Sequence, residues 1–162
     1  MPFLVRWPGA IKPRTRIDAM ALNLDFAPTF LEAAGVRVPA GMQGRSLVPV
    51  LRGRTPADWR SSMYYRYYHD PGDHNTRAHY GVRTKTHKLI YFWKKDQWEL
   101  FDLVNDPFEL HNLYGQPGQE ALAASLKAEL ERVKHAARDE NQLANELIPN
   151  GVDGSVAKLR GK

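Results

Sequence analysis

Four short segments rich in aromatic and β-branched residues constrain the fold of this chain more than any other feature. They span residues 63–69, 79–84, 88–93 and 97–103, and the short polar links TKTH and KKDQ join the last three. Links of that length are typical of β-hairpins. The pattern therefore predicts an antiparallel sheet of about four strands.

The third of these segments indicates that both faces of the sheet are covered. Successive side chains of a strand point to opposite faces. Leu89, Tyr91 and Trp93 therefore share one face, and Ile90 and Phe92 share the other. Both sets are apolar, so we expect a cover on each side, of which only one is evident later in the chain.

That cover is a helix expected over residues 119–138. Its apolar stripe has helical spacing and consists of Leu122, Leu126, Leu130 and Val133. A further helix start is expected at Asp106, because an N-cap residue, a proline and a glutamate follow one another in DPFE. The last residues, 139–162, mix Gly, Pro and charge and are interpreted as a flexible tail.

The first third of the chain looks incomplete as a domain. Residues 2–7 and 17–24 are expected to form short strands. Two strands and two helices do not make a domain by themselves. They resemble the last units of an α/β sheet whose other strands are missing, so we expect an α/β class overall and α+β within this fragment.

Two helices are expected in the same region. Asp25 is a plausible N-cap for a helix over residues 26–34, and Gly35 is suited to end it. A shorter helix is expected over residues 46–53, with Ser46 as its cap. Capping explains Ser46 better than catalysis does, because the chain has no G-x-S-x-G nucleophile elbow.

Acidic and histidine side chains gather near the first predicted hairpin. They are His69, Asp70, Asp73, His74 and His79. Their spacing matches no known metal-binding motif, so we interpret them as a polar loop and predict no metal site and no catalytic residue in this chain.

A ligand surface is the more interesting interpretation of the same region. His79 and Arg83 share one face of the second predicted strand, and His74 and Arg77 lie in the loop before it. Imidazole and guanidinium groups beside aromatic rings suit an anionic or hydroxyl-rich ligand. A packed histidine is an equal alternative for His74 and His79, and for Arg83 we favour a structural salt bridge.

Charge and composition leave three functions open. The formal net charge is +5 with a pI of about 9.5, there is no cysteine, and no apolar run is long enough to cross a membrane. An enzyme fragment, a freestanding carbohydrate- or anion-binding module and a basic nucleic-acid binder all agree with these values. The scattered basic residues and the absence of an RNP-like signature make nucleic acid the weakest of the three.

A resemblance separates these alternatives. The stretches MPFLVRWPGAIKP, LNLDFAPTFLEAAGV, MQGRSLVPVLRG, WRSSMYYRYY, HYGVRTKTHKLIYFW and WELFDLVNDPFELHNLY follow one another over about residues 2–135. In order and spacing they resemble the C-terminal part of an arylsulfatase-type sulfatase of the alkaline phosphatase superfamily. YYRYYHDPGDH…HYGVRT looks most like members acting on sulfated sugars, such as N-acetylglucosamine-6-sulfatases and N-sulfoglucosamine-type enzymes.

The resemblance implies a division of labour. Residues 1–60 correspond to the end of the catalytic α/β domain, and residues 61–138 correspond to the C-terminal subdomain. The family's formylglycine comes from a C/S-x-P-x-R motif that is absent here, so formylglycine and Ca²⁺ are expected in a missing N-terminal half, and a truncated reading frame is the simplest account of Met1.

The resemblance also implies a ligand and a location. Of the residues in this chain, His74 and His79, and less securely Arg77, correspond to positions near the sugar. A sulfated carbohydrate and the missing sulfatase domain are therefore the expected partners, without nucleic acid or membrane. A periplasmic or secreted location is expected as well.

Overall fold

The computed structural model describes residues 3–70 and 75–141. The chain divides into two compact units, residues 1–61 (unit 1) and residues 62–162 (unit 2). Within the described residues, no helix has the length and apolar character that crossing a membrane requires.

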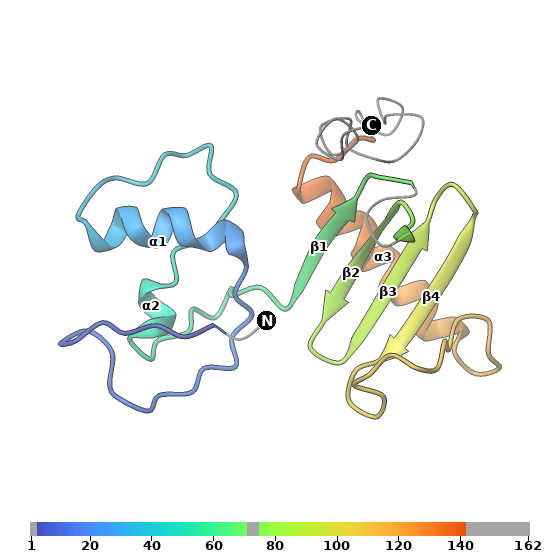
Figure 1. Cartoon of the computed structure of the whole chain (residues 1–162), viewed down its shortest axis with the longest axis horizontal. Helices are drawn as coiled ribbons and strands as arrows, with labels where there is room; N and C mark the ends of the chain where they lie inside the picture. The colour runs from blue at the N-terminus through green and yellow to red at the C-terminus, as the bar shows by residue number, and fades with distance from the viewer. Residues whose placement is uncertain (1–2, 71–74, 142–162) are drawn as a thin grey trace, which may run out of the picture. The chain divides into compact units, whose positions relative to one another are not determined.

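Unit 2 contains the expected antiparallel sheet (Figure 1). Its strands are β1 (Ser62–Tyr67), β2 (His79–Thr84), β3 (His87–Phe92) and β4 (Gln97–Asp102). They lie in the order β1-β2-β3-β4, so each strand pairs with its neighbour along the chain. The prediction of an antiparallel sheet of four strands, with short links between the last three, is confirmed.

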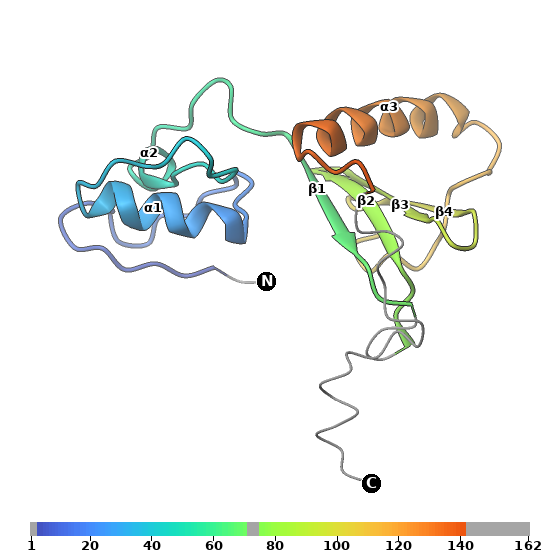
Figure 2. The same cartoon turned by 90° about the horizontal axis from the view of Figure 1, so that it is seen from above.

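Helix α3 covers one face of this sheet (Figure 2). It spans Glu120–Ala136, within one or two residues of the predicted bounds. Leu126, Leu130 and Val133 of its stripe are buried and pack against the core of the sheet. The sheet contributes side chains that are fully or almost fully buried, namely Tyr80, Val82, Leu89 and Leu100.

The opposite face of the sheet is called the open face here. Ile90 and Phe101 are buried on it, with 6% and 7% of their surface exposed. Part of its cover comes from the segment after β4, because Lys88 Nζ donates a 2.5 Å hydrogen bond to Glu109 Oε2. That segment supplies a cover that the sequence pattern alone did not reveal.

The same segment corrects the expected helix at Asp106. Residues 103–112 form turns and contain no helix. Glu109 has a φ of 57°, in the left-handed region, where a helix cannot continue. The Asp106 carboxylate instead accepts a 2.8 Å hydrogen bond from the amide of His111 and closes the turn.

The edge of β4 that pairs with no other strand is covered by the residues that follow this turn. Asn112 Oδ1 accepts a 2.9 Å hydrogen bond from the amide of Leu100, and the amide of Leu113 donates a 2.8 Å bond to the Leu100 carbonyl. An unpaired strand edge is a template for aggregation. Residues 112–113 therefore close this edge at its centre.

Unit 1 has helices and loops. Its elements are η1 (Asn23–Asp25), α1 (Phe26–Ala33) and α2 (Val48–Leu51). The predicted helices are confirmed with shorter bounds, and Gly35 ends α1 with a φ of 71°. The expected strands at 2–7 and 17–24 are wrong for the described residues 3–7 and 17–24. A strand needs a hydrogen-bonding neighbour, and the described part of unit 1 provides none.

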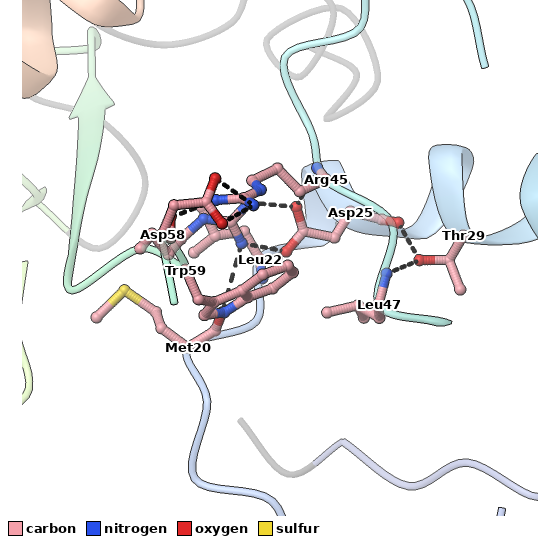
Figure 3. Close-up of polar contacts among 9 residues, drawn as sticks. Met20, Leu22, Asp25, Thr29, Arg45, Leu47, Asp58 and Trp59 are labelled. Atoms are coloured by element: carbon pink, nitrogen blue, oxygen red, sulfur yellow. Dashed lines mark hydrogen bonds and ion pairs between the residues drawn. The ribbon is translucent and has the colours of Figure 1, made fainter. Parts of the chain in front are cut away.

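Asp25 organises unit 1 as a buried carboxylate (Figure 3). Its side chain is completely buried, and it accepts 2.8 Å hydrogen bonds from the amides of Leu22 and Arg45. The guanidinium of Arg60 forms a forked ion pair with the same carboxylate. Asp25 does occupy the N-cap position of α1, but its side chain makes no capping bond because these other donors use its oxygens.

The side chains of Thr29 and Trp59 extend this cluster by three hydrogen bonds (Figure 3). Thr29 Oγ1 donates to the Asp25 carbonyl at 2.5 Å and accepts from the amide of Leu47 at 2.8 Å. Trp59 Nε1 donates to the carbonyl of Met20 at 3.0 Å. The loops of unit 1 are therefore fixed by polar contacts between residues far apart in the sequence.

Candidate functional site

His79 lies in an aromatic environment on the open face. It opens β2 and pairs across the sheet with Tyr67, the last residue of β1. Its ring stacks on Tyr67 with centroids 5.8 Å apart, and Tyr65 and Phe92 lie 5.8 and 5.4 Å away. Three aromatic side chains, two from β1 and one from β3, thus surround this imidazole.

A hydrogen bond fixes the tautomer of His79. Its Nδ1 lies 2.7 Å from the carbonyl oxygen of Arg77. A carbonyl can only accept, so Nδ1 carries a proton and Nε2 carries the lone pair of the neutral ring. The hydrogen bonds found among the described residues use only Nδ1, which leaves Nε2 able to accept a bond from a ligand hydroxyl.

Charged groups surround Asp70, which lies beyond the end of β1. Arg77 Nη1 is 3.3 Å from Asp70 Oδ1, and Lys94 Nζ is 4.0 Å from Asp70 Oδ2. The Asp70 side chain is only 11% exposed, whereas those of Arg77 and Lys94 are 38% and 41% exposed. Two cations therefore share one carboxylate, and this group keeps a positive charge that suits an anionic ligand.

Two of the three predicted site residues come together in this way. His79 and Arg77 are joined by the tautomer-fixing hydrogen bond, and His74 lies outside the described residues. Lys94 was missed, although its place in the turn between β3 and β4 is a usable signal. Asp70 is ion-paired and mostly buried, and is not the solvated loop acid that we expected.

The interpretation of Arg83 needs correction. Its backbone lies in β2 as expected, but the side chain is exposed and forms no ion pair within the described part of the chain. The expected structural salt bridge is therefore wrong. Arg83 lies on the open face of the sheet, on the same side as His79 and Gly81.

The residues present do not fit a sulfatase's metal ion or nucleophile. Within residues 3–70 and 75–141, no group of three His, Cys, Asp or Glu side chains could hold a metal. Ser46 Oγ accepts a 3.2 Å hydrogen bond from the amide of Val48, which agrees with a role at the start of α2. The sequence contains neither cysteine nor a C/S-x-P-x-R motif.

Proteins of known activity are similar to this chain in sequence. The family described as N-sulphoglucosamine sulphohydrolase, C-terminal, matches residues 1–136. An N-acetylglucosamine-6-O-sulfatase of Bacteroides thetaiotaomicron is 42% identical over 151 residues, which cover 91% of this chain and 27% of that protein. This chain thus spans about a quarter of the length of that relative.

Solved structures agree. The structure of BT4656 in complex with its substrate D-glucosamine-2-N,6-O-disulfate has a TM-score of 0.80 and 43% identity, covering 84% of this chain and 28% of that one. A phosphonate monoester hydrolase from Silicibacter pomeroyi has a TM-score of 0.69 and 26% identity, covering 86% and 29%. The fold therefore also occurs in a hydrolase of another ester.

The match with the sulfatase structure is stronger than the match with the phosphonate monoester hydrolase. None of these proteins is described as a nucleic-acid binder or a freestanding binding module. The four-stranded antiparallel sheet with its C-terminal helix corresponds to the C-terminal part of their structures. The chain belongs to the N-sulphoglucosamine sulphohydrolase C-terminal family, in the sulfatases of the alkaline phosphatase superfamily.

Proposed function

We propose that this chain forms the sugar-facing part of a sulfatase that removes sulfate from a sulfated carbohydrate, with 6-O-sulfated glucosamine as the favoured residue. The observation that carries the proposal is the fixed tautomer of His79, which directs an acceptor nitrogen away from the Arg77 carbonyl. The substrate class is supported by two similar proteins, an N-acetylglucosamine-6-O-sulfatase that is 42% identical and BT4656, 43% identical, whose structure holds D-glucosamine-2-N,6-O-disulfate.

Each side chain of the site has a role in this proposal. His79 Nε2 accepts a hydrogen bond from a sugar hydroxyl, and the rings of Tyr67 and Phe92 form apolar walls beside it. Arg77 and Lys94 attract an anionic substituent of the sugar, because Asp70 neutralises only one of their two charges. His74 remains a predicted sugar contact on the strength of the resemblance.

The chemical step belongs to groups outside this chain. In the proposed arrangement a preceding segment carries formylglycine and Ca²⁺, and this chain completes the fold and shapes the substrate pocket. The periplasm or the cell exterior is the proposed location. The first of these proposals is supported by the similarity to sulfatases, and the second rests on the resemblance described above.

The test is a titration of the purified chain with glucosamine 6-sulfate, followed by NMR of the histidine imidazoles. We expect the His79 resonances to move, while those of His111, whose side chain is 79% exposed, stay in place. The His79→Phe variant keeps an aromatic ring but removes Nε2, and it should weaken binding. Unchanged His79 resonances at saturating ligand, or equal binding by the variant, contradict the proposal.

A further inference from the structure

The net positive charge of the chain belongs entirely to unit 1. Residues 1–61 hold nine Lys and Arg against four Asp and Glu, whereas residues 62–162 hold fourteen of each. The formal net charge of +5 is therefore that of unit 1 alone. Two of its four carboxylates are already used, because Asp25 pairs with Arg60 and Asp58 pairs with Arg45.

Four of the remaining cations form what we call the basic stretch. They are Arg6, Lys12, Arg14 and Arg16. All four residues are exposed, and residues 12–18 form an unbroken exposed run. Within the described part of the chain, none of the four takes part in an ion pair. Burying such cations without partners is costly, so any group that covers this surface has to supply anionic or other polar partners.

The shape of the basic stretch is fixed by local contacts. Thr15 Oγ1 donates a 2.7 Å hydrogen bond to the carbonyl of Lys12, and Arg14 adopts a φ of 59°. The four basic residues all line one concave surface of unit 1, with a volume of about 880 Å³. The cations from Arg6 to Arg16 thus border one concave surface, whose lining also includes apolar side chains such as Val50 and Leu51.

The stretch is poorly suited to bases of a nucleic acid. Recognition of single strands depends on free aromatic faces for stacking. Two rings line the concave surface, and both already contact other side chains: the ring of Phe3 lies 5.1 Å from that of Phe26, and the guanidinium of Arg52 lies 5.6 Å from the ring centroid of Trp7. Repeated charges beside rings that are engaged in this way instead suit a polymer that is recognised through its anionic groups.

We propose that the basic stretch binds a sulfated polysaccharide chain as a polyanion, as a second site made by unit 1 alone. Its four cations contact sulfate or carboxylate groups along the polymer, independently of the sugar contacted by His79. In an enzyme acting on such a polymer, this site would retain the chain between successive reactions. The proposal does not depend on which sugar residue is desulfated.

The test compares two triple variants of the 162-residue chain on immobilised heparin. One variant is Lys12→Gln/Arg14→Gln/Arg16→Gln, and the other is Arg83→Gln/Lys85→Gln/Lys95→Gln, which removes the same charge from exposed residues of unit 2. We expect the first to elute at clearly lower salt and the second to elute close to the wild type. The slope of log affinity against log salt should fall by about 2 to 3 for the first variant only.

Three results would overturn the proposal. They are unchanged elution of the first variant, equal loss in both variants, and equally tight binding of a single-stranded oligonucleotide, which would assign the surface to nucleic acid. Circular dichroism and thermal unfolding of both variants confirm that the comparison concerns folded protein. Because His79 is unchanged throughout, failure here leaves the proposed sugar site unaffected.

Discussion

The guanidinium of Arg60 and the carboxylate of Asp25 form a forked ion pair across 35 positions of sequence, with the Asp25 side chain completely buried and that of Arg60 only 13% exposed. Removing one member of a buried pair leaves the other charge without compensation. Replacing Asp25 removes more than this ion pair, because the amides of Leu22 and Arg45 also lose their hydrogen-bond acceptor.

The Asp25→Ala variant should therefore lose about 3–5 kcal/mol of stability in unit 1. Hydrogen exchange of the Arg45 amide, which donates to Asp25, reports this loss locally. The matched control is Asp58→Ala, which breaks an ion pair whose side chains are 36% and 79% exposed and should cost less than about 1 kcal/mol. Similar losses in the two variants would contradict the role assigned to Asp25.

Adjacent tyrosines on β1 should respond oppositely to loss of their hydroxyl groups. The hydroxyl of Tyr64 donates a hydrogen bond to the carboxylate of Asp139. Burial, and to a lesser extent this hydrogen bond, raise the pKa of Tyr64 far above its usual value. Tyr64→Phe should cost about 1.5–3 kcal/mol, as expected for a hydrogen bond to a charged group. Urea unfolding of unit 2 measures the effect.

The hydroxyl of Tyr65 is buried but has no hydrogen-bond partner among the described residues. Burial raises its pKa, and the charge of Glu109 raises it further. Tyr65→Phe should be neutral or stabilise unit 2 by up to about 1 kcal/mol, because a desolvated and unsatisfied group is removed. A clear loss of stability would indicate that the hydroxyl has a partner.

Gly81 occupies a position on β2 where a methyl group does not fit. An added Cβ would lie 2.4 Å from the carbonyl oxygen of Leu89 and 2.8 Å from the hydroxyl oxygen of Tyr65. Gly81→Ala should cost about 1–3 kcal/mol through overpacking. Gly41→Ala, where nothing lies within 4 Å, should change stability by less than about 0.5 kcal/mol, and thermal unfolding distinguishes the two.

The stability of unit 2 should depend on pH in the acid range. Hydrogen bonds from Arg132 lower the pKa of Glu129 from 4.5 to about 2, despite opposing burial. Burial also opposes ionisation of Asp139, yet bonds from Tyr64 and Arg66 leave its pKa below the usual value. A folded-state pKa below the unfolded one adds stability above the unfolded pKa, which is lost as pH falls through the folded value.

Urea midpoints should accordingly stay constant down to about pH 5 and decline between about pH 4.5 and pH 2. Glu129→Gln removes the carboxylate whose pKa is lowered to about 2, so its acid decline should be shallower than that of the wild type. An identical decline in the wild type and the variant would show that Glu129 does not contribute.

The isolated chain should not turn over an aryl sulfate. The sequence has no C/S-x-P-x-R motif and no cysteine, and the described residues offer no metal-binding group. A sensitive assay with and without added Ca²⁺ should give the rate of a blank preparation. Turnover that follows the protein through purification would contradict this prediction and the division of labour proposed above.

Periodicity was sufficient for the elements that carry their own pattern. The stripe from Leu122 to Val133 predicted α3, and alternation in residues 88–93 predicted the two faces of the sheet. By contrast, residues 3–7 have the composition of a strand but form none, because a strand depends on a partner that its own sequence does not contain. Composition alone could not distinguish these cases.

Polar clusters were the least predictable features, because their members are distant in sequence. Asp25 looked like a local helix cap, yet the amide of Arg45, 20 positions away, and Arg60, 35 positions away, use its oxygens. Similarly, the link from Lys94 to Asp70 appears only once the hairpins bring their ends together. His79 and Arg77 were predicted as neighbours from their positions in and just before the second strand, and the structure joins them by a hydrogen bond that the sequence did not predict.

The order β1-β2-β3-β4 has a consequence for the folding of the site. Pairing between consecutive strands closes short loops, and proteins dominated by such local pairings fold faster than those that join distant segments. His79 pairs with Tyr67 in the first hairpin, and its imidazole is held by a carbonyl two residues away. We therefore expect the orientation of this imidazole to be set by the first hairpin itself, before α3 completes the core.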